Sequence, residues 1–147
     1  MKKVSKKIKD TEQIAKIFLE KILNLKKIHS GAFVVGLVGD LGAGKTAFVQ
    51  AVAKHLGIKN KISSPTFVIM KKYVLKNKKY NLFFHLDAYR LKNEKELLHL
   101  GWEEIINDEK NLVFIEWPEN VSKIMPKHTK YIHISDQKDG EKHFKFK

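Results

Sequence analysis

Eight consecutive residues carry the clearest chemical pattern in the chain. They follow the spacing G-x-x-x-x-G-K-[ST], at Gly39, Asp40, Leu41, Gly42, Ala43, Gly44, Lys45 and Thr46. Glycines let the backbone curl closely enough for its N–H groups to surround an anion, and a helix that starts at the lysine adds the positive end of its dipole. The pattern therefore predicts a loop that binds the phosphates of a nucleotide.

Lys45 and Thr46 have separate expected roles in this loop. The Lys45 ammonium is expected to reach the β- and γ-phosphates, and the Thr46 hydroxyl is expected to ligate Mg2+. The elements typical of a GTPase, D-x-x-G and N-K-x-D, do not occur after Thr46. The sequence therefore favours ATP and Mg2+ as the bound cofactors.

A second acidic group is expected at the end of a strand beside the phosphates. Two apolar segments end in an acid, residues 82–87 in Asp87 and residues 112–116 in Glu116. One carboxylate would hold the ion, directly or through water, and the other would polarise the attacking water. Which acid has which role stays open, so both are candidate metal ligands and, with Lys45, candidate catalytic residues.

Four further side chains have two interpretations each. Thr66, after a proline turn, either senses the γ-phosphate like a switch loop or only starts a strand. Arg90, the only arginine, either binds a phosphate or pairs with a carboxylate, because its guanidinium is a planar, two-pronged donor. Trp117 either stacks on a base or packs at a strand end. His85 is expected on the same strand face as Asp87, and we interpret it as a hydrogen-bonded structural histidine rather than a ligand.

The hydrophobic pattern predicts the elements that position these residues. Helices are expected over 11–25, capped by Asp10, and over 45–56 and 94–100; strands are expected over 33–38, 67–75, 80–87, 112–117, 131–135 and 143–146. Continuous apolar runs at 33–38 and 112–117 are typical of strands covered on both faces. The predicted class is α/β: a single P-loop domain over 1–147, with a central, mostly parallel sheet, an antiparallel annex, flanking helices and a basic N-terminal extension at 1–9.

Composition restricts the class of protein further. The 147 residues have a formal net charge of +13 and include no cysteine, which excludes disulfides, thiolate catalysis and cysteine-ligated zinc. The longest apolar run, residues 32–38, is too short to span a bilayer, and the basic N-terminus lacks the apolar core of a secretory signal. We therefore expect a cytoplasmic protein without membrane contact.

Four motifs in order make the chain similar to a known family. The segments GDLGAGKT, SSPTF, HLDAYRL and IEWPE resemble those of the TsaE (YjeE) family, over about residues 11–117. The family consists of small bacterial P-loop ATPases that take part in making N6-threonylcarbamoyladenosine in tRNAs. The resemblance implies a compact α/β P-loop fold and an ATPase that works with TsaB- and TsaD-like partner subunits, through which tRNA contact is possible.

The resemblance also implies residue roles. Residues 42–46 would hold the phosphates, with Thr46 and Glu116 around Mg2+. Asp87 would be the Walker B-like acid, Thr66 would lie in a switch-like segment, and Thr11 would lie near the base or ribose. No residue of the C-terminal segment receives a role.

Two other functions compete with this one. A small-molecule kinase would share the phosphate loop but needs an acceptor site, usually under an arginine-rich lid, for which this chain has little room. A nucleotide-gated tRNA binder would use the strip from Lys54 to Tyr80, which contains eight lysines and no acid.

Overall fold

One mixed sheet organises the molecule. The structure, a computed structural model, describes residues 1–26, 30–59, 69–77 and 79–147. Within these residues, strands pair in the order β1-β7-β6-β2-β5-β4-β3. Their bounds are β1 (Lys2–Ser5), β2 (Phe33–Val38), β3 (Met70–Val74), β4 (Leu82–Asp87), β5 (Asn111–Glu116), β6 (Lys130–Asp136) and β7 (Lys142–Phe146).

The strand directions confirm the predicted sheet. The four central strands β6, β2, β5 and β4 run parallel to one another. Strand β3 pairs antiparallel with β4 at one edge, while β7 and then β1 extend the opposite edge in antiparallel pairs. The α/β class with an antiparallel annex is therefore observed, with annex strands at both edges.

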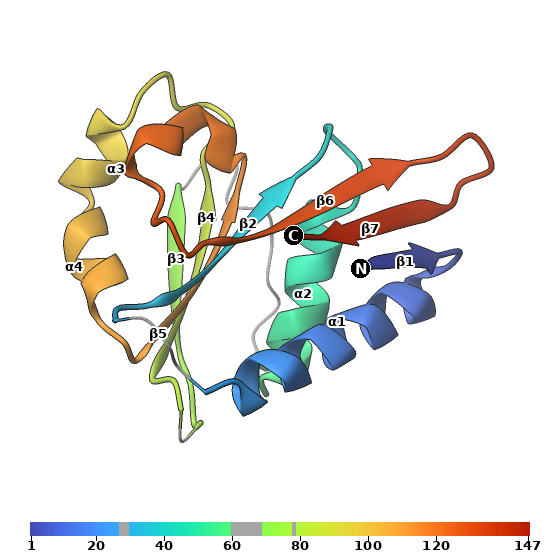
Figure 1. The fold of residues 1–147 in the computed structure, drawn as a ribbon, viewed down its shortest axis with the longest axis horizontal. Coiled ribbons are helices and arrows are strands. Elements are labelled where there is room, and N and C mark those ends of the chain that lie inside the picture. The colour runs from blue at the N-terminus through green and yellow to red at the C-terminus, as the bar shows by residue number, and fades with distance from the viewer. Residues whose placement is uncertain (27–29, 60–68, 78) are drawn as a thin grey trace.

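Helices cover both faces of the sheet (Figure 1). Helices α1 (Ile8–Asn24) and α2 (Lys45–His55) pack on one face. Helices α3 (Lys95–His99) and α4 (Trp102–Asn107) and the 3-10 helix η1 (Pro118–Ile124) pack on the other. The buried strands β2 and β5 contribute side chains to both cores, which explains their continuous apolar runs.

The N-terminal segment differs from its expected description as a basic extension. Residues 2–5 form β1, which pairs with β7, and α1 begins at Ile8, before the predicted start at Thr11. Asp10 lies in the first turn, where its Oδ2 accepts hydrogen bonds from the backbone N–H groups of Lys6, at 2.9 Å, and Lys7, at 3.3 Å. These bonds satisfy N–H groups just before the helix, as a capping box does, so the helix starts earlier than the apolar pattern indicates.

The sheet brings the carboxyl ends of its central strands together. Glu116 is the register partner of both Leu37 in β2 and Asp87 in β4. Residues in register on parallel strands point to the same face, which here is the face covered by α2. The acids predicted from two separate segments are therefore neighbours beside the loop that leaves β2.

Candidate functional site

The loop predicted to bind phosphates connects β2 to α2. Gly42 and Gly44 have φ angles of +77° and +106°, in the region that side chains disfavour, and Gly44 is the N-cap of α2. Gly39 has no room for a β-carbon, because the carbonyl oxygen of Ile134 in β6 lies against its Cα. The loop therefore needs glycine for two reasons: a left-handed backbone in its second half and close packing in its first.

Lys45 is folded into the loop. Only 5% of the residue is exposed, and its Nζ donates hydrogen bonds to the carbonyl oxygens of Gly39 and, at 2.9 Å, Asp40. The same Nζ lies 4.3 Å from the centre of the Trp117 ring, a cation–π distance. Burial lowers the pKa of Lys45, although the negative charges of Glu116 and Asp87 oppose that shift.

Glu116 is the central carboxylate of the site. It is 3% exposed, and the Thr46 hydroxyl lies 3.1 Å from its Oε1 and 3.2 Å from its Oε2. On its other side, His85 Nε2 lies 2.6 Å from Oε2. The histidine is fully buried, so Glu116 is held between a helix hydroxyl and an interior imidazole.

Asp87 lies beside Glu116 but is more open to the surface. Its Oδ1 accepts a hydrogen bond of 2.9 Å from the backbone N–H of Tyr89. Burial raises the pKa of Asp87, and the neighbouring Glu116 charge adds to the rise, while the Tyr89 N–H lowers it. The two carboxylates on adjacent strands line the same cavity but differ in environment, because Glu116 is buried and Asp87 is only half-buried.

Trp117 and Tyr89 form an aromatic wall. Their ring centroids are 5.0 Å apart and the rings are tilted by 48°. Trp117 has a φ of +59°, and it is the only residue other than glycine in the described part of the chain with a positive φ. Such a backbone is unfavourable for a bulky residue and is concentrated at functional sites.

These groups surround one cavity of about 310 Å³. Its lining comes from the loop, the start of α2 and the ends of β4 and β5, and consists of Leu41, Gly42, Gly44, Lys45, Thr46, Ala47, Asp87, Tyr89, Glu116 and Trp117. Most residues predicted for the phosphate and metal site therefore meet in one place.

Among the predicted residues that the structure describes, the ones that do not line this cavity are Thr11, Gly39, Asp40, Ala43 and Arg90. Thr11 lines an adjacent hollow with Gly44 and Ala47, and its hydroxyl is 2.7 Å from that of Ser5. Arg90 is exposed and does not line the cavity. Thr66 lies outside the described residues.

The oxygen groups of the cavity fit Mg2+. This ion prefers oxygen ligands and is usually held by one or two carboxylates, phosphates and water. Thr46 and Glu116 already converge, and Asp87 faces the same space. The described residues contain no cluster of three or more acidic, histidine or cysteine side chains suited to a metal.

Sequence reasoning missed two contacts of the site. It placed His85 on the correct face, but nothing in a single strand shows that its ring reaches an acid on the next strand. It assigned no role to Lys142, whose Nζ lies 3.2 Å from the carbonyl oxygen of Gly42. In a chain so rich in lysine, no sequence signal distinguishes this residue.

Comparison with known proteins points to one family. The family described as threonylcarbamoyl adenosine biosynthesis protein TsaE matches residues 5–144. The tRNA threonylcarbamoyladenosine biosynthesis protein TsaE of Rickettsia prowazekii is 42% identical over 118 residues, which are 80% of this chain and 74% of the relative. The protein of the same name from Bacillus subtilis is 35% identical over 113 residues, 77% of this chain and 68% of the relative.

A solved structure agrees with this assignment. The crystal structure of YdiB from Bacillus subtilis superposes with a TM-score of 0.75 at 27% identity, covering 99% of this chain and 83% of that one. The likeness therefore covers nearly all of this chain.

Proposed function

The chain belongs to the TsaE family, and from that premise we propose that it binds and hydrolyses ATP with Mg2+ in the biosynthesis of threonylcarbamoyladenosine in tRNA. Its relatives carry the name of that pathway. We further propose that it acts in the cytoplasm, with TsaB- and TsaD-like subunits, and that any contact with tRNA is made through that complex. In the described residues, no helix is long and apolar enough to cross a membrane.

The observation that supports this proposal best is the convergence of Lys45, Thr46 and Glu116 on one cavity. Backbone N–H groups at the start of α2 would bind the phosphates, and the Lys45 ammonium would leave its loop carbonyls for the β- and γ-phosphate oxygens. Thr46 and Glu116 would hold Mg2+, which neutralises charge on the transferred phosphoryl group. Asp87, at the open side of the cavity, would orient the attacking water.

The site accounts for hydrolysis more readily than for transfer to a metabolite. The chain has a single arginine, whereas a kinase of this type usually closes an arginine-rich lid over its acceptor. The names of the relatives do not favour a small-molecule kinase either. A phosphorylated metabolite formed from labelled ATP would support the kinase instead.

The direct test uses the purified chain, alone and with its two partner subunits. We expect slow ATP hydrolysis by the chain alone and a changed rate when the partners are added. Lys45→Ala should remove most of the affinity for ATP, because the ammonium is the principal cation facing the phosphates. The proposed role in a complex would be rejected if the partners left the rate of ATP hydrolysis unchanged and the chain did not co-elute with them.

A further inference from the structure

The C-terminal hairpin of β6 and β7 reaches the phosphate-binding loop. Strand β7 begins at Lys142, and the Lys142 ammonium donates a hydrogen bond of 3.2 Å to the carbonyl oxygen of Gly42. The stem of the same side chain also packs on the loop, since a β-carbon at Gly44 would lie 3.3 Å from Lys142 Cδ. A residue 100 positions away in sequence thus contacts two glycines of the loop.

A carboxylate on the neighbouring strand holds this lysine in place. Asp136 ends β6 and is the register partner of Lys142, and its Oδ1 lies 2.5 Å from Lys142 Nζ. An ammonium has three donors, and the described residues offer Lys142 two acceptors, Asp136 and Gly42. One N–H therefore remains for a further acceptor, on a side chain that is 30% exposed.

Lys142 lines a second hollow, of about 140 Å³, next to the cavity that contains the carboxylates. The two spaces share Gly44 and Ala47, at the start of α2. Thr46 and Glu116 line only the first, whereas Thr11 and Lys142 line only the second. A nucleotide with its terminal phosphates beside Thr46 can therefore extend across Gly44 and Ala47 into the second hollow.

We propose that Lys142 contacts the bound nucleotide on its nucleoside side, at the α-phosphate or ribose, and so makes the C-terminal hairpin part of the nucleotide site. This inference rests on the proposed function. A cation held by Asp136 is preorganised, so it loses little side-chain freedom when it binds an anionic oxygen. Because ATP and ADP share their nucleoside and α-phosphate, Lys142 should contribute equally to the affinity of both.

The test measures the affinities of ATP and ADP for the full chain by calorimetry, in the wild type and three variants. Lys142→Met keeps the length of the stem and removes the charge. Lys142→Arg restores a cation. Lys145→Met is the matched control, since Lys145 lies on the same strand but is exposed on the opposite face of the sheet. Thermal melting of each variant without nucleotide reports the stability of the fold.

Lys142→Met should weaken the binding of ATP and ADP by about tenfold each, which is the size expected for one charge-assisted hydrogen bond. The ratio of the two affinities should change by less than about twofold. Lys142→Arg should recover most of the loss, and Lys145→Met should bind like the wild type.

Three results would overturn the proposal for Lys142. The first is wild-type affinity in Lys142→Met. The second is a loss for ATP alone, which would place the lysine at the terminal phosphate. The third is a loss of nucleotide affinity in Lys142→Met that Lys142→Arg does not reverse, with a lower melting temperature in both variants. That result would show that Lys142 has a structural role only. A wild-type chain that binds neither nucleotide would instead reject the proposed function itself.

Discussion

At the level of single residues, Glu116 determines how the site is arranged. It contacts a hydroxyl from α2 and an imidazole from β4, and it is the register partner of Asp87. A nearly fully buried carboxylate is costly unless hydrogen bonds satisfy it. The His85 and Thr46 contacts provide those bonds, so the acid stays in a fixed position beside the loop.

Replacing this carboxylate should separate binding from hydrolysis. Glu116→Gln keeps the shape of the side chain but removes its charge, so we expect ATP affinity to stay within a few-fold of the wild type while hydrolysis falls by about 10² or more. Single-turnover hydrolysis and nucleotide titration measure the two effects. Glu119→Gln, in η1 and outside the cavity lining, is the control; normal hydrolysis by Glu116→Gln would contradict the assignment.

His85 offers a second prediction at this scale. Its Nε2 bonds to Glu116, while its Nδ1 is buried and has no partner among the described residues. His85→Phe removes the donor to Glu116 at similar volume, so we expect the Mg2+ concentration for half-maximal hydrolysis to rise by about tenfold, the lower end of the range for groups that orient a metal ligand. ATP affinity measured without metal should change little. An unchanged Mg2+ dependence would show that His85 serves packing alone.

At the level of elements, the site depends on strand ends that a buried core keeps in register. Tyr80, just before β4, is 1% exposed and belongs to the core between the sheet and helices α1 and α2. Phe83 and Phe114, on adjacent strands, pack in the same core with ring centroids 5.4 Å apart. Changes that loosen this core should therefore also loosen the edge of the sheet at which Asp87 and Glu116 lie.

Alkaline pH provides a test of that core. Burial raises the pKa of Tyr80 to about 12, whereas a tyrosine in the unfolded chain ionises near pH 10. Above that pH the unfolded state loses its proton first, so the folded state loses about 1.4 kcal/mol of stability per pH unit until the folded pKa is reached.

Tyr80→Phe cannot ionise and should escape this loss. Between pH 9 and 11, urea denaturation should show a smaller fall in the free energy of unfolding for Tyr80→Phe than for the wild type. Tyr89→Phe, at a position that is 41% exposed, should follow the wild type. If the free energy of unfolding fell equally with pH in the wild type and in Tyr80→Phe, Tyr80 would ionise in the folded state without a burial cost.

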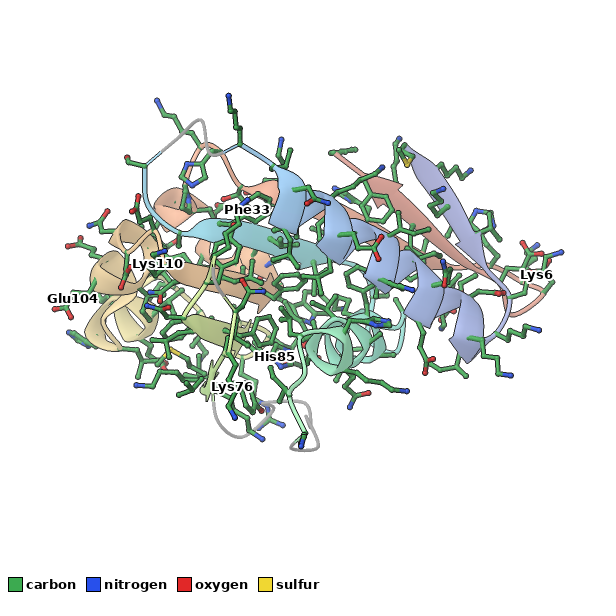
Figure 2. All side chains as sticks on the ribbon, turned by 90° about the horizontal axis from the view of Figure 1, so that it is seen from below. Lys6, Phe33, Lys76, His85, Glu104 and Lys110 are labelled. Carbon is green, nitrogen blue, oxygen red and sulfur yellow. The ribbon has the colours of Figure 1, made fainter. Side chains whose placement is uncertain are left out.

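At the level of the whole molecule, the charges and the sheet edges are unevenly distributed. Helix α4, which contains Glu104, lies at one end, and the lysine-rich start of the chain, with Lys6, lies at the other (Figure 2). Strand β1 closes the edge of the sheet at the lysine-rich end by pairing with β7. The hairpin that carries Lys142 is thus supported by the first residues of the chain.

Removing residues 1–5 should weaken this end of the molecule. The deletion leaves the outer edge of β7 unpaired and breaks the bond between Ser5 and Thr11, so we expect Tm to fall by about 5 °C or more. An exposed strand edge also favours association, which light scattering after size exclusion would detect. The double substitution of Lys2→Gln and Lys3→Gln keeps the strand and should leave Tm unchanged. An equal fall of Tm in this double variant would show that the loss of charge causes the effect.

The sequence alone determined the features that depend on local pattern. The phosphate loop, the apolar strands β2 and β5 and the two acids at strand ends were all predicted, because glycine spacing and hydrophobic runs are properties of neighbouring residues. The order of motifs was enough to indicate the family. The helix over residues 45–56 was also predicted closely, since a glycine precedes it and another follows it.

Only the tertiary structure decided which of these residues meet. Strand order placed Glu116 between Leu37 and Asp87, and it brought His85 and Thr46 to the same carboxylate from two different elements. It also built the basic N-terminus into the sheet and brought Lys142 to the loop. Such contacts depend on strand pairing over long separations, whose free energy comes from burial and register in the folded molecule rather than from any local preference of the chain.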